Sequence, residues 1–409
     1  MKRAGEFTST PSKISPWSVR EPVTPDRKRG PPIPLKASPT KQLQIRSAFS
    51  RDPIKTYVFF DLECTGLIKN DDSRNLLLRP LEKTEDHYNI LNQLCLETRN
   101  DELPYITEMS FIAISSETFD ELQAERQKYI EWNDRNPVFK KALRKHVPTN
   151  THTRLINPTM MSEGEWESYE RLRLSDKNGV IVHSKKDCQR NNSFKEEWPG
   201  VIQFFDSLQK PALLIAHNSI KYDLRVIYGE LQRNKMLEDY GIPADVFFMD
   251  SYCMAKKIED TIVKELVTVC KYIKFPKVIK NGENEESSEK IVITDSVEEL
   301  ASSTTHNPTT SNNILTSDHP VNILDWDRFS SALKKRIRKN GFVKTLNGEW
   351  TYKHGQSTFS LSALYEQLVG GNFTAHYAQQ DSEALMHVCI SYGNDFIQYA
   401  NNAASAIPF

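Results

Sequence analysis

The chain has 409 residues, of which 38% are hydrophobic and 26% are charged, and its formal net charge is −1. This length suffices for one large domain with tails, or for two domains. No run of 18 apolar residues occurs, and the N-terminus has no apolar signal core, so we expect neither membrane insertion nor secretion. The six cysteines are scattered without a CxxC pair, which favours reduced intracellular thiols over disulfides or a zinc site.

Residues 1–54 are predicted to be a disordered basic tail. The tail is rich in Pro, Ser and Thr, and Met1 to Lys55 contains 12 Lys/Arg against four Asp/Glu. The cluster Arg27-Lys28-Arg29 is consistent with a nuclear import signal, and a plain solvated tail is an equal alternative. We therefore expect the protein in the nucleus, the cytoplasm or both.

Apolar runs and helical periodicities then alternate along the chain. Runs rich in β-branched and aromatic residues predict strands at 54–60, 104–115, 151–158, 211–218 and 245–251. Charge content and apolar spacing predict helices at 116–150, 198–209 and 221–233. The polar segment 68–103 is expected to be a loop-rich insertion. This alternation predicts an α/β fold with a mixed sheet.

The second half is less regular. Residues 276–323 are polar and acidic and are predicted to be a disordered insert, followed by a basic helix and connection over 324–354. Helical periodicity returns at 359–370 and 376–400. One ordered domain is therefore expected from two parts, 55–275 (with insertions near 68–103 and 116–150) and 355–409.

Two carboxylates stand at the end of the first strand, in VFFDLECTGL. Residues i and i+2 of a strand share a face, so Asp61 and Glu63 point the same way while Leu62 faces the core. Two neighbouring acids beside a buried strand need a counter-charge, and carboxylate oxygens suit Mg²⁺ or Mn²⁺. A helix cap or a surface pair is the alternative for this stretch alone.

Two further acids follow in LLIAHNSIKYDLRVI and HYAQQDSEALMHV. Asp223 lies about one turn past a predicted strand, and His376 precedes Asp381 by five residues. That spacing separates two side chains by about 140° on a regular helix. His376 and Asp381 therefore face one site only if His376 lies just before the helix, on a mobile loop. His217 is expected to be a structural hydrogen-bonding residue.

Together, DLECTGL, AHNSIKYD and HYAQQD resemble the three motifs of the DEDDh (DnaQ-like) 3′→5′ exonucleases. PYITEMSFIAIS and AHNSIKYDLRVIYGEL are similar to the three-prime repair exonuclease branch of that superfamily. The resemblance covers roughly residues 55–275 and 355–400, and it implies an RNase H-like mixed sheet flanked by helices. The chain departs from the family at Gln379, where the family usually has Glu, a residue that the chemistry does not need.

The resemblance implies hydrolysis of a phosphodiester with two Mg²⁺ ions, for which Mn²⁺ substitutes. Asp61 would bridge both ions, and Glu63, Asp223 and Asp381 would complete their ligation. His376 would deprotonate the attacking water, since its ordinary pKa near 6.5 suits a base at neutral pH. The product would be a nucleoside 5′-monophosphate.

The resemblance also implies a substrate-binding set around these acids. Leu67 would wedge against the terminal base, and Tyr222 would pack on or hydrogen-bond the strand. The whole set is Cys64, Thr65, Leu67, Asn218, Tyr222 and His376. The expected substrate is DNA, as a single strand or at the 3′ termini of a duplex, with no membrane partner.

Several alternatives stay open. RNA-trimming relatives use the same five residues, and a non-catalytic nucleic-acid-binding protein or a scaffold held by the tails are further classes. The LKKRIRK cluster (Leu333 to Lys339) either contacts phosphates or is a solvated basic face or second import signal. The resemblance also suggests a homodimer formed through an edge strand at Pro104 to Ser115.

Overall fold

The computed structural model describes residues 52–69, 86–135, 149–176, 179, 181–272, 337, 341–346, 349–353 and 358–409. These residues belong to one compact unit, Leu35–Phe409. Almost all of the predicted tail, the whole predicted insert 276–323 and most of the LKKRIRK cluster lie outside the described residues.

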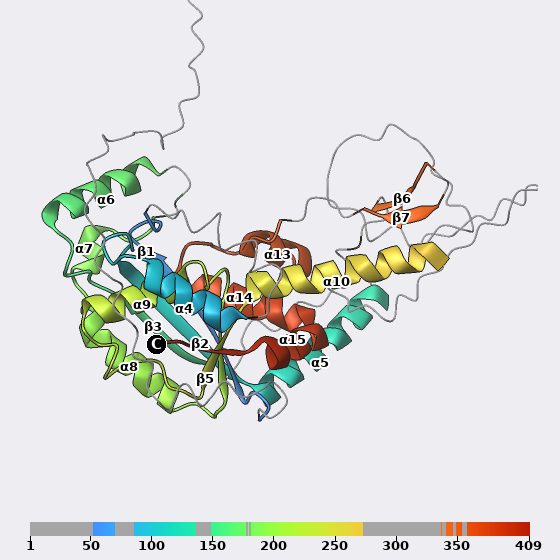
Figure 1. The fold of residues 1–409 in the computed structure, drawn as a ribbon, viewed down its shortest axis with the longest axis horizontal. Helices are drawn as coiled ribbons and strands as arrows, with labels where there is room; N and C mark the ends of the chain where they lie inside the picture. The colour runs from blue at the N-terminus through green and yellow to red at the C-terminus, as the bar shows by residue number, and fades with distance from the viewer. Residues whose placement is uncertain are drawn as a thin grey trace, which may run out of the picture. The chain divides into compact units, whose positions relative to one another are not determined.

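A mixed six-stranded sheet organises the unit, in the order β3-β2-β1-β4-β5-β8 (Figure 1). Its strands are β1 (Thr56–Cys64), β2 (Ile106–Ser115), β3 (Asn150–Leu155), β4 (Ala212–Ala216), β5 (Val246–Asp250) and β8 (Ser405–Ala406). β1 pairs antiparallel with β2 and parallel with β4, which pairs parallel with β5. The expected α/β class, an RNase H-like mixed sheet flanked by helices, is confirmed.

Alternate residues of β1 enter two different cores, as the two-residue period of a strand requires. Val58 and Phe60 belong to one core and Tyr57 and Phe59 to the other. Helices on the first side are α4 (His87–Glu97), α8 (Phe194–Asp206) and α9 (Asp223–Arg233). Helices on the second side are α5 (Ser116–Arg135), α10 (Ser251–Tyr272), α13 (Leu361–Leu368), α14 (Ala378–Tyr392) and α15 (Asn394–Ala403). The central strands β1, β2, β4 and β5 are therefore buried on both faces, whereas the outer strand β3 is largely exposed.

The structure corrects the loop expected at 68–103 and adds detail to two later segments. The segment 68–103 contains α4, whose Leu91 and Leu94 enter the core at helical spacing. Within 324–354, part of the expected connection is a hairpin of β6 (Phe342–Lys344) and β7 (Trp350–Tyr352) that packs on α10. Most of the expected basic helix lies outside the described residues. The periodic run 376–400 is two helices, because Gly393 takes a positive φ of 62° between them.

Two helices that the sequence patterns did not predict lie between β3 and α8, namely α6 (Glu163–Ser175) and α7 (Lys185–Cys188). Reciprocal capping boxes start both helices, through Ser162 and Ser184. A small core of Trp166, Tyr169 and Cys188 joins them.

The strand expected to form a dimer edge is not an edge. β2 lies between β1 and β3 and pairs with both, so its backbone groups are used within the sheet. β3 forms the outer strand on this side. Within the described part of the chain, no helix is long and apolar enough to cross a membrane.

Candidate active site

The carboxyl end of β1 presents Asp61 and Glu63 beside β2. In the antiparallel register, Asp61 faces Ser110 and Glu63 faces Glu108. Leu62 between them is buried in the core of α4, α8 and α9, as predicted. Asp61 and Glu63 therefore point to the opposite face, which α14 covers.

Helix α14 brings the third acid. It packs on both β1 and β2, and Asp381 lies in its first turn. One carboxylate oxygen from each of Asp61, Glu63 and Asp381 lies within 4.8 Å of the other two. Segments 320 residues apart in the chain thus form one cluster of oxygen donors.

The fourth acid comes from the start of α9. Asp223 is the first residue of this helix and is buried. Its carboxylate accepts a hydrogen bond from the backbone of Leu62, the residue between Asp61 and Glu63. All four acids predicted from the three motifs therefore meet at one edge of the sheet.

Burial and mutual repulsion act on these acids in the same direction. Burial raises the pKa of Asp61 well above its usual range, and the charges of Asp223, Asp381 and Glu63 raise it further. Burial, followed by the charge of Asp381, raises the pKa of Glu63 to about 8. Burial also raises the pKa of Asp223 to about 7. A divalent cation bound by these oxygens would remove the repulsion, and hard oxygen donors of this kind fit Mg²⁺ or Mn²⁺.

A fifth carboxylate, Glu108 on β2, joins the site and was not foreseen. It is buried, and its Oε2 lies 2.8 Å from Nε2 of His183 and accepts a hydrogen bond from the Ala378 backbone at 3.1 Å. His183 stands just before α7, and its ring packs edge-on against Tyr377. Glu108 thus links the α6–α7 segment to the start of α14. The signal in the sequence was an acid inside the otherwise apolar run ITEMSFIAIS.

His376 lies where the spacing required it, two residues before α14. Its backbone N–H donates to Oδ2 of Asp381 at 2.7 Å. Burial raises the pKa of Asp381, and the hydrogen bond from His376 offsets only part of that rise. Its φ of 70° is in the left-handed region, which costs energy for a residue other than glycine. The residue is therefore held by its surroundings in a conformation that the chain does not favour by itself.

The loop between β4 and α9 is fixed by Asp250 at the end of β5, a second residue that the sequence reading missed. Oδ1 of Asp250 accepts hydrogen bonds from the backbone N–H groups of Asn218 and Tyr252, and Oδ2 accepts one from Ile220. Asn218, in the predicted substrate-binding set, has a φ of 68°. Asp250 therefore determines the path of the chain that leads into Asp223.

His217 is a structural hydrogen-bonding residue, as predicted. Its Nε2 donates to the carbonyl of Phe359 at 2.7 Å, so its Nδ1 accepts from Ser251 at 2.9 Å. Burial lowers the pKa of His217, which favours this neutral form. The ring joins the end of β4 to the segment before α13.

The predicted substrate residues of β1 lie in the turn after the strand. Leu67 is 60% exposed, whereas burial raises the pKa of the Cys64 thiol. Thr65 is paired twice with Tyr105: its N–H donates to the Tyr105 carbonyl at 2.9 Å, and its Oγ1 accepts from the Tyr105 N–H at 3.0 Å. The Tyr222 hydroxyl donates to the Gly66 carbonyl. Thr65 and Tyr222 thus hold the turn, and Leu67 is the side chain that it exposes.

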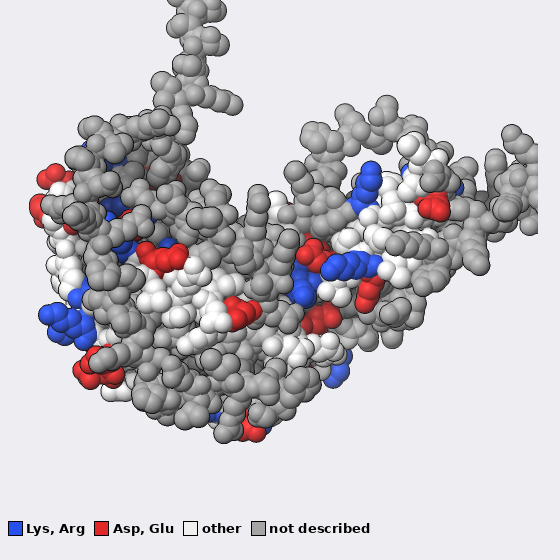
Figure 2. Space-filling view, in the orientation of Figure 1, with Lys and Arg blue, Asp and Glu red and all other residues white. Residues whose placement is uncertain are grey.

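Charged side chains are dispersed over the face seen in Figure 2, where acidic and basic groups of the described residues are interspersed.

Gln379, the residue at which the chain departs from the family it resembles, donates a hydrogen bond to Glu383 one turn further along α14. This contact points its side chain along the helix surface, toward Glu383.

Comparison with family models and with curated proteins gives no match. Among solved structures, the zinc-bound form of the E. coli ExoI–ssDNA complex aligns with a TM-score of 0.35 and 10% identity. The alignment covers 84% of this chain and 42% of that one, so this chain spans less than half of that protein. Similarity at this level does not transfer a function.

Proposed function

We propose that the chain is a metal-dependent 3′→5′ exodeoxyribonuclease of the DEDDh type. The observation that carries the proposal is that carboxylate oxygens of Asp61, Glu63 and Asp381 lie within 4.8 Å of one another. The carboxylate of Asp223 joins them through a hydrogen bond from the backbone of Leu62. Such a cluster of partly buried acids is costly for the metal-free fold, and costly groups of this kind concentrate at functional sites.

Each residue has a distinct task in this proposal. Asp61, Glu63, Asp223 and Asp381 would hold two divalent cations. When bound, these ions supply an acidified water and charge stabilisation for the leaving 3′ oxygen. His376 would accept the proton of the attacking water, since it sits beside Asp381 and outside the helix. Leu67 would contact the terminal base, because it is exposed next to the acids.

DNA is the proposed substrate, on the resemblance of the motifs to the repair branch. The test is a time course on single-stranded DNA and RNA, labelled at either end, with Mg²⁺. It compares the wild type with Asp61→Asn and His376→Ala, and with Asp245→Asn as a control, since Asp245 is a half-exposed acid paired with Lys210.

Stepwise shortening of DNA from the 3′ end, lost in Asp61→Asn and His376→Ala and kept in Asp245→Asn, is the expected result. Faster shortening of RNA would move the assignment to an exoribonuclease. Binding of either polymer without cleavage would overturn the enzymatic proposal in favour of a binding module.

A further inference from the structure

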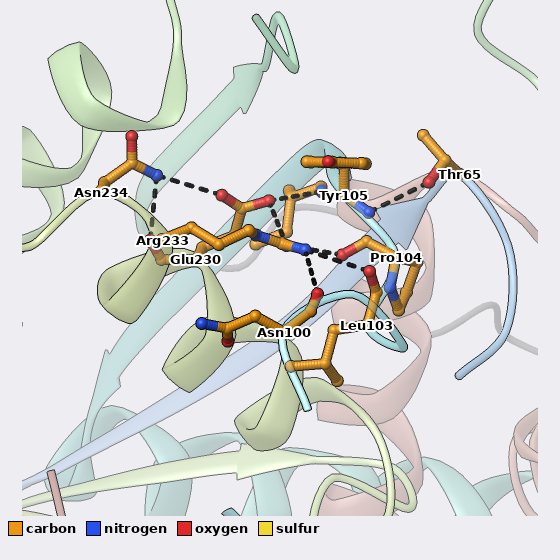
Figure 3. A network of polar contacts seen from close by, with 9 residues as sticks. Thr65, Asn100, Leu103, Pro104, Tyr105, Glu230, Arg233 and Asn234 are labelled. Carbon is orange, nitrogen blue, oxygen red and sulfur yellow. Dashed lines mark hydrogen bonds and ion pairs between the residues drawn. The ribbon is translucent and has the colours of Figure 1, made fainter. Parts of the chain in front are cut away.

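Helix α9 ends in a buried arginine with an unusual set of contacts (Figure 3). Only 8% of the Arg233 side chain is exposed. Its Nη1 donates to the carbonyls of Asn100 and Leu103 at 3.2 and 3.0 Å. Its Nη2 donates to the carbonyl of Pro104 at 2.7 Å and to Glu230 at 2.8 Å. One guanidinium thus binds three carbonyls of the irregular segment before β2.

The partner of this arginine holds the same segment from a second direction. Glu230 is buried and accepts hydrogen bonds from the Ile106 backbone at 3.3 Å and from Asn234 at 3.2 Å. The Tyr105 ring lies 4.3 Å from the Arg233 guanidinium. Arg233 and Glu230 together, hereafter the clamp, fix the backbone from Asn100 to Ile106 against the end of α9.

The clamped segment leads directly to the proposed active site. Its Tyr105 exchanges two hydrogen bonds with Thr65, as described above, and Thr65 begins the turn that exposes Leu67. The same turn is held on its other side by Tyr222, the residue before Asp223. The Thr65–Leu67 turn is therefore supported from both ends of helix α9, which is about 16 Å long: by Tyr222 at the start of the helix and by Arg233 at its end.

We propose that the clamp is a positioning device for substrate: Arg233 and Glu230 set the Thr65–Leu67 turn relative to the four acids, and so determine how a 3′-terminal nucleotide is seated. The inference rests on the proposed function, because it assigns Leu67 to the terminal base. Buried ion pairs contribute little net stability by themselves, whereas a planar fork that binds three carbonyls defines geometry. A lysine keeps the charge and loses the fork.

The first experiment compares Arg233→Lys with the wild type in steady-state cleavage of single-stranded DNA. The expected result is a rise in KM on the order of tenfold, with a smaller change in kcat, because a displaced turn weakens seating of the end. Thr65→Val removes the hydroxyl that accepts from Tyr105 and should raise KM in the same way. The double variant should be no worse than the stronger single variant, because both act through one chain of contacts.

The matched control is Arg126→Lys. Arg126 is another buried arginine whose guanidinium donates to a backbone carbonyl, that of Leu368, and it lies on α5, outside the clamp. This variant should keep the wild-type KM. An unchanged KM in Arg233→Lys and Thr65→Val, or an equal rise in Arg126→Lys, would overturn the positioning role.

A second readout does not depend on catalysis. Amide hydrogen exchange in metal-free protein should accelerate at Thr65, whose N–H donates to Tyr105, when Arg233 is replaced by Lys. Acceleration confined to the turn and to 100–106 supports the clamp, whereas no change, or acceleration throughout the protein, contradicts it. If the wild type does not cleave nucleic acid, but Arg233→Lys still exchanges faster than the wild type only in the turn and in 100–106, the proposed function is overturned. The contacts of the clamp with the turn are then still supported.

Discussion

Asp61 shows most clearly what the cluster of acids costs the metal-free protein. It is held beside Asp223, Asp381 and Glu63, and burial and these charges raise its pKa. Like charges in a poorly solvated site repel strongly, so the fold is under electrostatic stress wherever the acids are ionised. Stress of this kind is released when a cation binds.

Asp61→Asn tests this view through stability. In EDTA at pH 8 the variant should melt at a higher temperature than the wild type, because one repelling carboxylate is removed. Mn²⁺ at about 100 times its dissociation constant should stabilise the wild type by about 2.7 kcal/mol and the variant far less. Melting curves with and without Mn²⁺ provide the measurement, with Asp245→Asn as the control. Equal metal stabilisation of both proteins would contradict the assignment of Asp61 as a ligand.

His376 allows a test of backbone strain at the same site. Its φ of 70° suits glycine, and each β-carbon in this region costs about 1 kcal/mol. His376→Gly should therefore be about 1 kcal/mol more stable than His376→Ala, while both lose activity. Urea unfolding measures the difference, and the same pair of substitutions at Lys235, with a φ of 57°, is the comparison. Equal stability of the glycine and alanine variants would show that the backbone relaxes.

At the scale of elements, the site exists because β1 ends, and α9 and α14 begin, at the same edge of the sheet. β1 supplies Asp61 and Glu63, α14 supplies Asp381, and α9 supplies Asp223. β4 runs parallel to β1, so the loop after β4 returns to the same edge. The path of that loop depends on Asp250.

Asp250→Ala should cost about 3 kcal/mol of unfolding free energy, because three backbone N–H groups lose their acceptor. Asp250→Asn keeps one carbonyl oxygen, which can serve Asn218 and Tyr252, and should cost less. Both variants should bind Mn²⁺ more weakly, since the loop into Asp223 loosens. Denaturant unfolding and metal titration measure these effects. Wild-type metal affinity in Asp250→Ala would show that α9 holds Asp223 without the loop.

At the scale of the whole molecule, two sets of partly or fully buried titratable groups give the metal-free protein a stability maximum. The pKa of Glu63 is raised to about 8 and that of Asp223 to about 7, so their contribution is full at acid pH and lost as the pH rises through these values. Burial lowers the pKa of His152, His217 and His387, so their contribution is present above about 6.5 and lost as the pH falls.

The metal-free protein should therefore be most stable near about pH 6 and lose on the order of 2 kcal/mol by pH 8. Mg²⁺ should remove the alkaline loss, because the bound carboxylates are ionised in the folded state, and should leave the acid loss unchanged. Denaturant unfolding across this pH range, in EDTA and in Mg²⁺, is the measurement. An alkaline loss that persists in Mg²⁺ would argue that the acids do not bind the ion.

Much of this molecule was predictable from local patterns. The period of two in VFFDLEC assigned β1 and the common face of Asp61 and Glu63, and five predicted strand segments match strands of the sheet. Such patterns fail where polar residues interrupt them. The charged flanks of segment 68–103 hide the short helix α4, so its sequence predicts a loop. The helix is stabilised by Leu91 and Leu94, which pack in the core.

The sequence by itself determined which residue types could bind a metal, since DLEC, YD and HYAQQD carry their acids at strand and helix ends, which periodicity locates. Only the tertiary structure decided that Glu108 joins the acids, that Asp250 directs the loop into Asp223, and that Arg233 reaches back to the segment before β2. These contacts join residues at least 30 positions apart, most of them more than 100. Their partners are chosen by the order of strands in the sheet and by the packing of α9 and α14, and local periodicity carries no information about either.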